Sequence, residues 1–126
     1  MKKTGFILLL MLLIVSVFAF VNYYSSAFTG TTTNAYVTAD SIVTKNIDNI
    51  SIAVYNSGST NSINYKIVEY YGSWDGVSYE AVLDTLANVE SNRYSTEKPM
   101  YGIKVLVKSA VAGSTSTYTG YLNFNK

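Results

Sequence analysis

Apolar and polar residues alternate with a period of two over most of the chain beyond residue 35. The clearest example is Met100–Ser109, where every second position is apolar: Tyr101, Ile103, Val105 and Val107. This period places one set of side chains on each face of a β-strand, whereas it would scatter apolar residues around a helix. The 12 Tyr and the single Pro agree with extended, half-buried strands. The pattern therefore predicts an all-β fold.

Seven segments have this character and are separated by turn residues. They are Ala35–Val43, Asn49–Asn56, Ile63–Tyr71, Val77–Leu83, Ser91–Thr96, Met100–Ser109 and Thr117–Phe124. The stretches Asn56–Ser62 and Gly72–Gly76 between them are rich in Gly, Ser, Asn and Asp, as hairpin loops require. We therefore expect a single Ig-like or jelly-roll-like β-sandwich of about seven antiparallel strands over residues 46–126.

The first 27 residues have the layout of a secretory signal peptide. Lys2 and Lys3 precede an apolar run of 16 residues, Phe6–Val21, which is expected to form a helix. The small residues Ser25 and Ala27 then suit a cleavage that would leave Phe28 as the mature N-terminus. This layout predicts a protein exported to the cell surface or beyond, with only transient membrane contact through the leader.

Two alternatives for this segment remain open. If residues 22–27 are added to the apolar run, it nearly reaches the ~20 residues that span a bilayer, and the chain would then keep a membrane anchor. The start MKKTG followed by Phe6 also resembles a type IV or archaeal pilin leader, which implies a retained helix in a filament core. Leu10 stands where the bacterial type IV pilins carry Glu.

Composition argues against catalysis and against nucleic-acid binding. The chain has no Cys and no His, so thiol chemistry, disulfides and the usual general base are absent. The acidic residues of the domain are expected to be solvated surface charges: Glu69, Asp75, Glu80, Asp84, Glu90 and Glu97. If Lys2 and Lys3 leave with the leader, the nine basic residues fall to seven against eight acidic ones. A nearly neutral chain lacks the clustered positive charge that nucleic acid requires. We expect no enzyme activity, no cofactor and no metal ion.

Two features are candidates for contacts with other molecules. Four aromatic residues lie near the turn Gly72–Gly76, namely Tyr70, Tyr71, Trp74 and Tyr79. Such a cluster can bind a carbohydrate or a protein partner, or Trp74 can instead cover the open end of the core. Asn49 begins the tripeptide Asn-Ile-Ser, which is a formal N-glycosylation site.

Residues 28–45 are expected to form a tether followed by a strand. The stretch Phe28–Thr33 is polar and Gly-containing, and the sequence places it outside the core. The strand after it can pair within its own sheet, or it can add to the open edge of a neighbouring copy and so build a filament. The candidate donor residues alternate along this segment: Thr31, Thr33, Ala35, Val37, Ala39, Ser41 and Val43.

The whole layout resembles the small secreted subunits of archaeal and bacterial surface filaments. These combine a signal sequence, a Thr-rich mature start and a Tyr-, Thr- and Asn-rich sandwich without Cys. The range Ile50–Leu122, with AVYNSGSTNSINYKIVEYYGSWDG and YGIKVLVKSAVAGSTSTYTGYL, is also similar to sandwich modules of phage virions and bacterial surface proteins. The resemblance implies a homopolymeric pilus or fimbria subunit of the donor-strand type, with an adhesive role toward surface glycans. A monomeric or membrane-anchored surface protein that binds through the four aromatic residues is the alternative.

Overall fold

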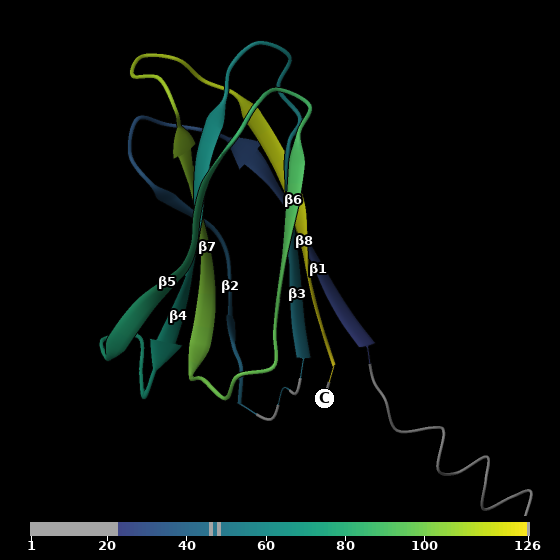
Figure 1. The fold of residues 1–126 in the computed structure, drawn as a ribbon, viewed down its shortest axis with the longest axis vertical. Coiled ribbons are helices and arrows are strands. Elements are labelled where there is room, and N and C mark those ends of the chain that lie inside the picture. The colour runs from purple at the N-terminus through teal and green to yellow at the C-terminus, as the bar shows by residue number, and fades with distance from the viewer. Residues whose placement is uncertain (1–22, 46, 48, 126) are drawn as a thin grey trace, which may run out of the picture.

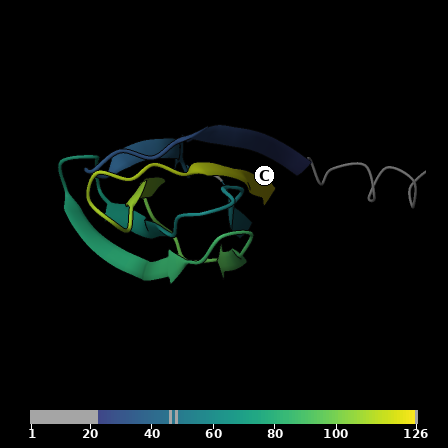
Figure 2. The same cartoon turned by 90° about the horizontal axis from the view of Figure 1, so that it is seen from above.

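The structure is a computed structural model that describes residues 23–45, 47 and 49–125. These residues form two antiparallel four-stranded sheets that pack face to face around an apolar interior (Figures 1 and 2). The predicted all-β sandwich is confirmed, with eight strands rather than about seven. The apolar helix expected before it lies outside the described residues. No helix within the described residues is long and apolar enough to cross a membrane.

The strands are β1 (Tyr23–Thr31), β2 (Val37–Val43), β3 (Asn49–Asn56), β4 (Ile63–Tyr71), β5 (Val77–Leu86), β6 (Ser91–Thr96), β7 (Gly102–Ser109) and β8 (Thr117–Asn125). One sheet has the order β1-β8-β3-β6 and the other has the order β2-β7-β4-β5. The chain changes sheet at every connection except the hairpin from β4 to β5. Eight strands with this order make a jelly roll, in which most pairings join distant parts of the chain.

The period-two pattern located the strands closely. The predicted ranges Asn49–Asn56, Ile63–Tyr71 and Ser91–Thr96 agree with β3, β4 and β6 at both ends. In β7, Ile103, Val105 and Val107 are all fully buried, while the residues between them face outward. The core consists of this row and its counterparts on the facing strands: Ile50, Ile52 and Val54 on β3, Ile63, Tyr65 and Ile67 on β4, and Tyr118 and Leu122 on β8. The hydrophobic effect of burying these rows holds the two sheets together.

The eighth strand, β1, comes from a segment for which no strand was predicted. It pairs with β8 over its whole length, from Tyr23 opposite Asn125 to Thr31 opposite Thr117. The prediction that Phe28–Thr33 lies outside the core is wrong, because Phe28 is only 7% exposed and belongs to the core cluster. The segment has few large apolar residues, and its packing depends on glycines that leave space for aromatic rings. A Cβ at Gly120 would collide with the Phe28 ring, and one at Gly30 would collide with Tyr118.

Hydroxyl groups fix the connector that leads from β1 to β2. The Thr32 side chain is 1% exposed, and its Oγ1 lies 2.9 Å from Ser109 Oγ and accepts a hydrogen bond from the Ser116 N–H at 2.8 Å. The Thr32 N–H in turn donates to the Ser116 carbonyl, and the Ser109 N–H donates to the Thr33 carbonyl, each at 2.8 Å. The connector is therefore tied to β7 and to the start of β8.

A buried amide organises the loops at the same end of the sandwich. Asn56, which is fully buried, donates from Nδ2 to the carbonyls of Asn61, Leu86 and Ala87. Its Oδ1 accepts hydrogen bonds from the Ser116 hydroxyl and the Gly58 N–H. One side chain thus binds backbone groups of the β3–β4 loop and of the β5–β6 connection, as well as the Ser116 hydroxyl before β8.

Candidate functional site

The four aromatic residues predicted to form one cluster are divided between two faces of the β2-β7-β4-β5 sheet. Tyr70 and Trp74 lie on its outer face, where their rings meet edge to face with centroids 5.1 Å apart. Tyr71 faces the interior and its hydroxyl donates to Glu69. Tyr79 is 58% exposed, and its ring lies 5.7 Å from the Lys98 ammonium. The cluster at the Gly72–Gly76 turn therefore consists of Tyr70 and Trp74 alone among these four.

Trp74 packs on the outer face of the sheet and does not close the end of the core. Its ring lies on the backbone of Gly102, where an added Cβ would be 2.5 Å from the Trp74 Cη2 atom. Tyr101 meets the same ring edge to face at 5.4 Å, and the Lys104 ammonium lies 4.5 Å from the ring centroid. The absence of a side chain at Gly102 is what lets the edge of the indole lie against β7.

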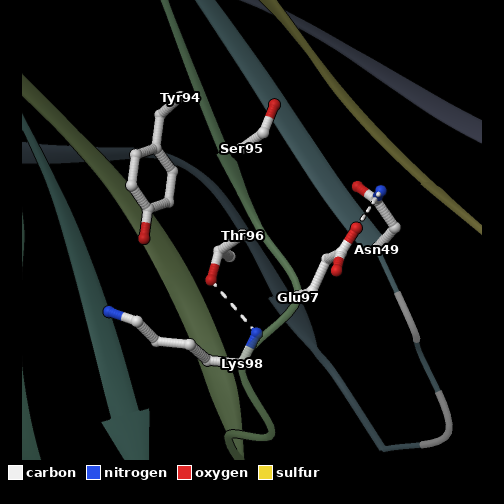
Figure 3. A pocket seen from close by; sticks show the side chains of 6 residues that line it. All are labelled: Asn49, Tyr94, Ser95, Thr96, Glu97 and Lys98. Carbon is white, nitrogen blue, oxygen red and sulfur yellow. Dashed lines mark hydrogen bonds between the residues drawn. The ribbon is translucent and has the colours of Figure 1, made fainter.

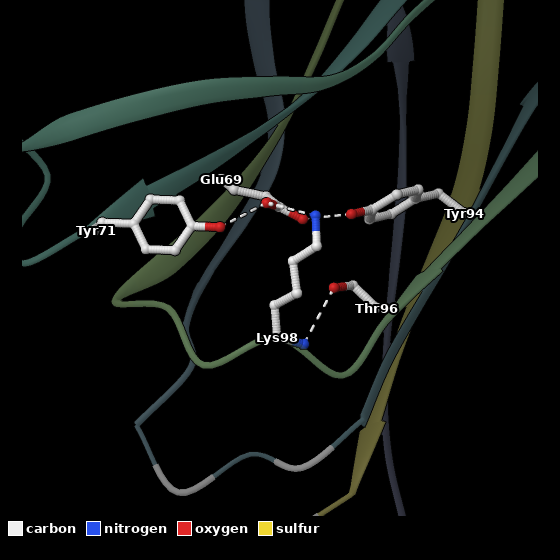
Figure 4. A network of polar contacts seen from close by, with 5 residues as sticks. All are labelled: Glu69, Tyr71, Tyr94, Thr96 and Lys98. Atoms are coloured by element: carbon white, nitrogen blue, oxygen red, sulfur yellow. Dashed lines mark hydrogen bonds and ion pairs between the residues drawn. The ribbon is translucent and has the colours of Figure 1, made fainter.

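A buried carboxylate occupies the opposite face of the same sheet, close to the end of β4 (Figure 4). Glu69 is 0% exposed. Its Oε2 accepts a hydrogen bond from the Tyr71 hydroxyl at 2.8 Å and lies 3.6 Å from the Lys98 ammonium. Its Oε1 accepts a hydrogen bond from the Tyr94 hydroxyl, which comes from β6 in the other sheet. The Glu69 network, defined by these four residues, therefore links the two sheets.

The expectation that Glu69 is a solvated surface charge is wrong. Period-two counting along β4 places Glu69 in the same inward row as Ile67 and Tyr71. That register is the sequence signal from which burial of Glu69 could have been predicted. An acidic residue in an inward row needs buried partners, because an unpaired charge in the interior is strongly unfavourable. The partners could not be identified from the sequence, since Tyr94 and Lys98 are far from Glu69 along the chain.

A shallow groove lies beside the Glu69 network (Figure 3). It has a volume of about 610 Å³ and is lined by Asn49, Tyr94, Ser95, Thr96, Glu97 and Lys98. Asn49, the residue of the glycosylation tripeptide, is exposed at the start of β3, and its Nδ2 donates to Glu97 Oε1 at 3.4 Å. Among the residues that the structure describes, no group of acidic side chains could hold a metal ion.

Alkaline pH is expected to destabilise the fold through Tyr94. Burial and the hydrogen bond to Glu69 raise the pKa of Tyr94 from 10.0 to about 12. Between these values the unfolded chain has lost the phenolic proton and the folded chain keeps it, so stability falls as pH rises from 10 to about 12. Urea midpoints measured across this range should fall less steeply for Tyr94→Phe than for the wild type.

The matched control is Tyr121→Phe, since Tyr121 is exposed on β8. This variant should keep the wild-type fall of the urea midpoint. Equal slopes for Tyr94→Phe and the wild type would contradict the assignment to Tyr94.

The predicted donor segment does not form one continuous strand. Thr31 is the last residue of β1, Thr33 and Ala35 lie in the connector, and the remaining four positions, Val37, Ala39, Ser41 and Val43, lie in β2. In this single chain β2 pairs with β7, and its register shifts between Thr38 and Asp40. The predicted cleavage between Ala27 and Phe28 falls within β1.

No family model matches the sequence, and no curated protein matches it in sequence. Among solved structures, PirA is similar with a TM-score of 0.60 and 17% identity, over 79% of this chain and 93% of PirA. The SPBc2 prophage-derived protein YomS is similar with a TM-score of 0.55 and 10% identity, over 86% of this chain and 96% of YomS. These likenesses establish the β-sandwich fold alone.

The chain also has a distant structural similarity to a subunit of Bacillus endospore appendages, which are described as disulfide-linked pili. The TM-score is 0.49 and the identity is 13%, over 83% of this chain and 88% of the appendage chain. The present chain has no Cys.

Proposed function

We propose that this chain is the structural subunit of an extracellular filament, in which β1 of each copy pairs with β8 of the next copy. The observation that carries the proposal is the position of β1. It lies at the edge of its sheet and pairs with β8 alone, so it can leave without breaking the rest of the sheet. A strand donated by a neighbour would restore the same ladder of hydrogen bonds.

The side-chain fit of β1 suits such an exchange. Phe28 is inserted into the core beside Gly120, and Tyr24 stacks on Phe124 with ring centroids 5.1 Å apart. When β1 is withdrawn from a copy, the space in the core that its Phe28 ring had filled is exposed. This space is an apolar socket of defined shape for the Phe28 ring of another copy. Because the donated strand and the socket lie on different copies, the contact is head to tail and can repeat without closing.

The connector Thr32–Tyr36 is the hinge of the proposed exchange. Its five residues could span about 17 Å when extended. Opening it would break the hydrogen bonds of Thr32 with Ser109 and Ser116. These bonds favour the closed single chain, and breaking them contributes to the barrier to exchange.

Strand β5 provides a second surface that favours self-association. It is a ten-residue edge strand, and Val77, Tyr79 and Leu83 on it are 75%, 58% and 65% exposed. An edge strand with exposed apolar side chains is a template for pairing with another chain. Contacts along β5 would join neighbouring rows of subunits and would bury these residues.

The proposal also constrains processing of the leader. A cut between Ala27 and Phe28 would remove five of the nine residues of β1. We therefore expect the mature chain to begin at or before Tyr23, which mass spectrometry of the exported protein would show. A mature N-terminus at Phe28 would contradict β1 as the donated strand.

A pair of cysteines distinguishes exchange between copies from pairing within one chain. Ala27 and Tyr121 are opposite residues of β1 and β8, and both are exposed. Directly opposed strand residues are close enough for a disulfide, and the chain contains no other Cys. In filaments of Ala27→Cys/Tyr121→Cys that assemble under reducing conditions and are then oxidised, we expect a ladder of covalent oligomers on a non-reducing gel.

The control pair is Ser51→Cys/Ser95→Cys, which joins β3 and β6. Neither strand takes part in the exchange, so oxidation should give monomers only. Filaments whose Ala27→Cys/Tyr121→Cys subunits remain monomeric after oxidation would show that β1 stays in its own chain. An exported wild-type protein that forms no filaments in electron micrographs would contradict the filament role itself.

A further inference from the structure

The outer face of the β2-β7-β4-β5 sheet carries a row of lysines. Lys66 on β4 and Lys104 and Lys108 on β7 occupy outward positions, because the residues directly before and after each of them are buried. These are three of the five lysines in the described part of the chain. Glu80 is the one acidic residue at the outward positions of β4, β5 and β7. A nearly neutral chain therefore has one face with an excess of positive charge.

The lysines follow one another at regular levels along the strands. Lys66 is opposite Leu106, and Leu106 lies midway between Lys104 and Lys108 on β7. Successive levels are two residues apart, which corresponds to about 7 Å. The Cα atoms of the three lysines therefore form a zigzag over about 13 Å, which suits an extended ligand with repeated negative charges better than one small anion.

Aromatic rings hold the lysine side chains in place. The Lys66 and Lys108 ammonium groups each lie 4.8 Å from the centroid of the Tyr36 ring. Lys104 lies 4.7 Å from the Tyr70 centroid and 4.5 Å from that of Trp74. Cation–π contacts of this kind restrict flexible side chains before a ligand arrives, which lowers the entropy lost on binding.

A groove of about 540 Å³ runs over this face. Val68 and Leu106 are apolar residues in its lining, and Lys66, Tyr70, Ser78 and Glu80 surround them. Lys66 is paired with Glu80 at 3.0 Å. In the described residues the other ion pair is Lys98 with Glu69, so Lys104 and Lys108 have no carboxylate partner. Lys104 and Lys108 are not among the residues that line the groove. The outer face of the sheet thus combines two uncompensated cations with an aromatic and apolar groove beside them.

We propose that this outer face of the β2-β7-β4-β5 sheet, which carries the lysines and the groove, binds an acidic polysaccharide. Such a polymer carries one carboxylate or sulfate per sugar or disaccharide, and its sugar rings offer apolar faces for Tyr70 and Trp74. Nucleic acid has a far denser charge, about one per 3.4 Å along each strand, and it would require a more strongly basic surface. The proposal does not depend on filament formation.

The test uses the purified full-length chain in a mild non-ionic detergent and measures binding by calorimetry at physiological salt. The probes are polygalacturonate, neutral dextran, a linear polyphosphate and a single-stranded oligonucleotide. We expect polygalacturonate to bind with a dissociation constant in the micromolar range and dextran not to bind. No binding of polygalacturonate would overturn the proposal. Equal binding of polyphosphate or of the oligonucleotide would show that the face responds to charge alone, which would also overturn it.

Substitutions locate the binding surface. Lys66→Gln, Lys104→Gln and Lys108→Gln should each weaken polygalacturonate binding about fivefold, and the triple variant about a hundredfold. Lys45→Gln is the matched control, because Lys45 is exposed and lies outside this face. An equal loss with Lys45→Gln, or no loss with the triple variant, would contradict the site.

Tyr70→Ala tests the ring separately from the charges. This variant should weaken polygalacturonate binding at high salt as well as at low salt, since ring contacts are not screened. Circular dichroism of each variant verifies that the fold is kept. If Tyr70→Ala binds polygalacturonate like the wild type, the Tyr70 ring does not belong to the site, and the proposed recognition of the sugar ring is wrong.

Discussion

Glu69→Ala is expected to lower the free energy of unfolding by about 2–4 kcal/mol, because it removes the acceptor that two tyrosine hydroxyls share. Glu69 is the common acceptor for the hydroxyls of Tyr71 and Tyr94. Without it, the partly buried hydroxyls of Tyr71 and Tyr94 both lose their carboxylate acceptor. A buried group left unsatisfied is unfavourable by about 1–3 kcal/mol. Urea unfolding monitored by tyrosine and tryptophan fluorescence measures the change.

A neighbouring carboxylate provides the control for Glu69. Glu97 is exposed, and its contact with Asn49 is at 3.4 Å. Glu97→Ala should therefore alter the free energy of unfolding by no more than about 0.5 kcal/mol. If Glu69→Ala and Glu97→Ala lower the free energy of unfolding by the same amount, burial of the Glu69 carboxylate is not the cause of the loss in stability.

An apolar replacement of the whole network distinguishes the effect of unsatisfied polar groups from the effect of lost side-chain volume. In the triple variant Glu69→Leu/Tyr71→Phe/Tyr94→Phe, no polar group of β4 or β6 remains unsatisfied at this place, and Lys98, which is already largely exposed, stays in water. Replacing all partners of a buried polar network by apolar groups is often nearly neutral. We expect this triple variant to be more stable than Glu69→Ala, and a less stable triple variant would contradict the polar origin of the loss.

The strands could be predicted closely because each carries its own period-two pattern. Ile103, Val105 and Val107 face the core whichever strands pair with β7, so the local sequence was enough to predict that they are buried. The sheet order could not be predicted, because pairing of β1 with β8 depends on partners at the two ends of the chain. β1 itself was missed because its fit depends on glycines: Phe28 is accommodated by Gly120, and this complementarity has no local signature.

The candidate sites show the same limit. The sequence identified Tyr70 and Trp74 as neighbours because they flank one turn, and the structure places their rings in contact. It also grouped Tyr71 with them, although adjacent strand residues point to opposite faces. Lys104 was not associated with these rings, since the pairing of β4 with β7 that brings it there is a long-range contact.

Phe28→Ala is expected to lower the free energy of unfolding by about 3–5 kcal/mol, because it removes a buried ring and leaves a cavity between β1 and the core. The ring is 7% exposed, and its contacts lie on β8, next to Tyr118 and Gly120. Ser26→Ala on the same strand is the control, since Ser26 is exposed and should contribute less than about 0.5 kcal/mol. Equal unfolding midpoints for Phe28→Ala and the wild type would show that β1 does not contribute to the folded chain in solution.

A double-mutant cycle with Gly120 tests the fit itself. The Cβ of Gly120→Ala would collide with the Phe28 ring and with the Ala53 carbonyl oxygen, so this variant should also be destabilised. Removing the Phe28 ring relieves the first collision and leaves the second, because the backbone of β3 cannot withdraw. The double variant Phe28→Ala/Gly120→Ala should therefore lose less stability than the two single losses added together. Strict additivity would mean that the ring and the glycine do not share the contact, and the socket proposed for a neighbour's β1 would then lack its defining feature.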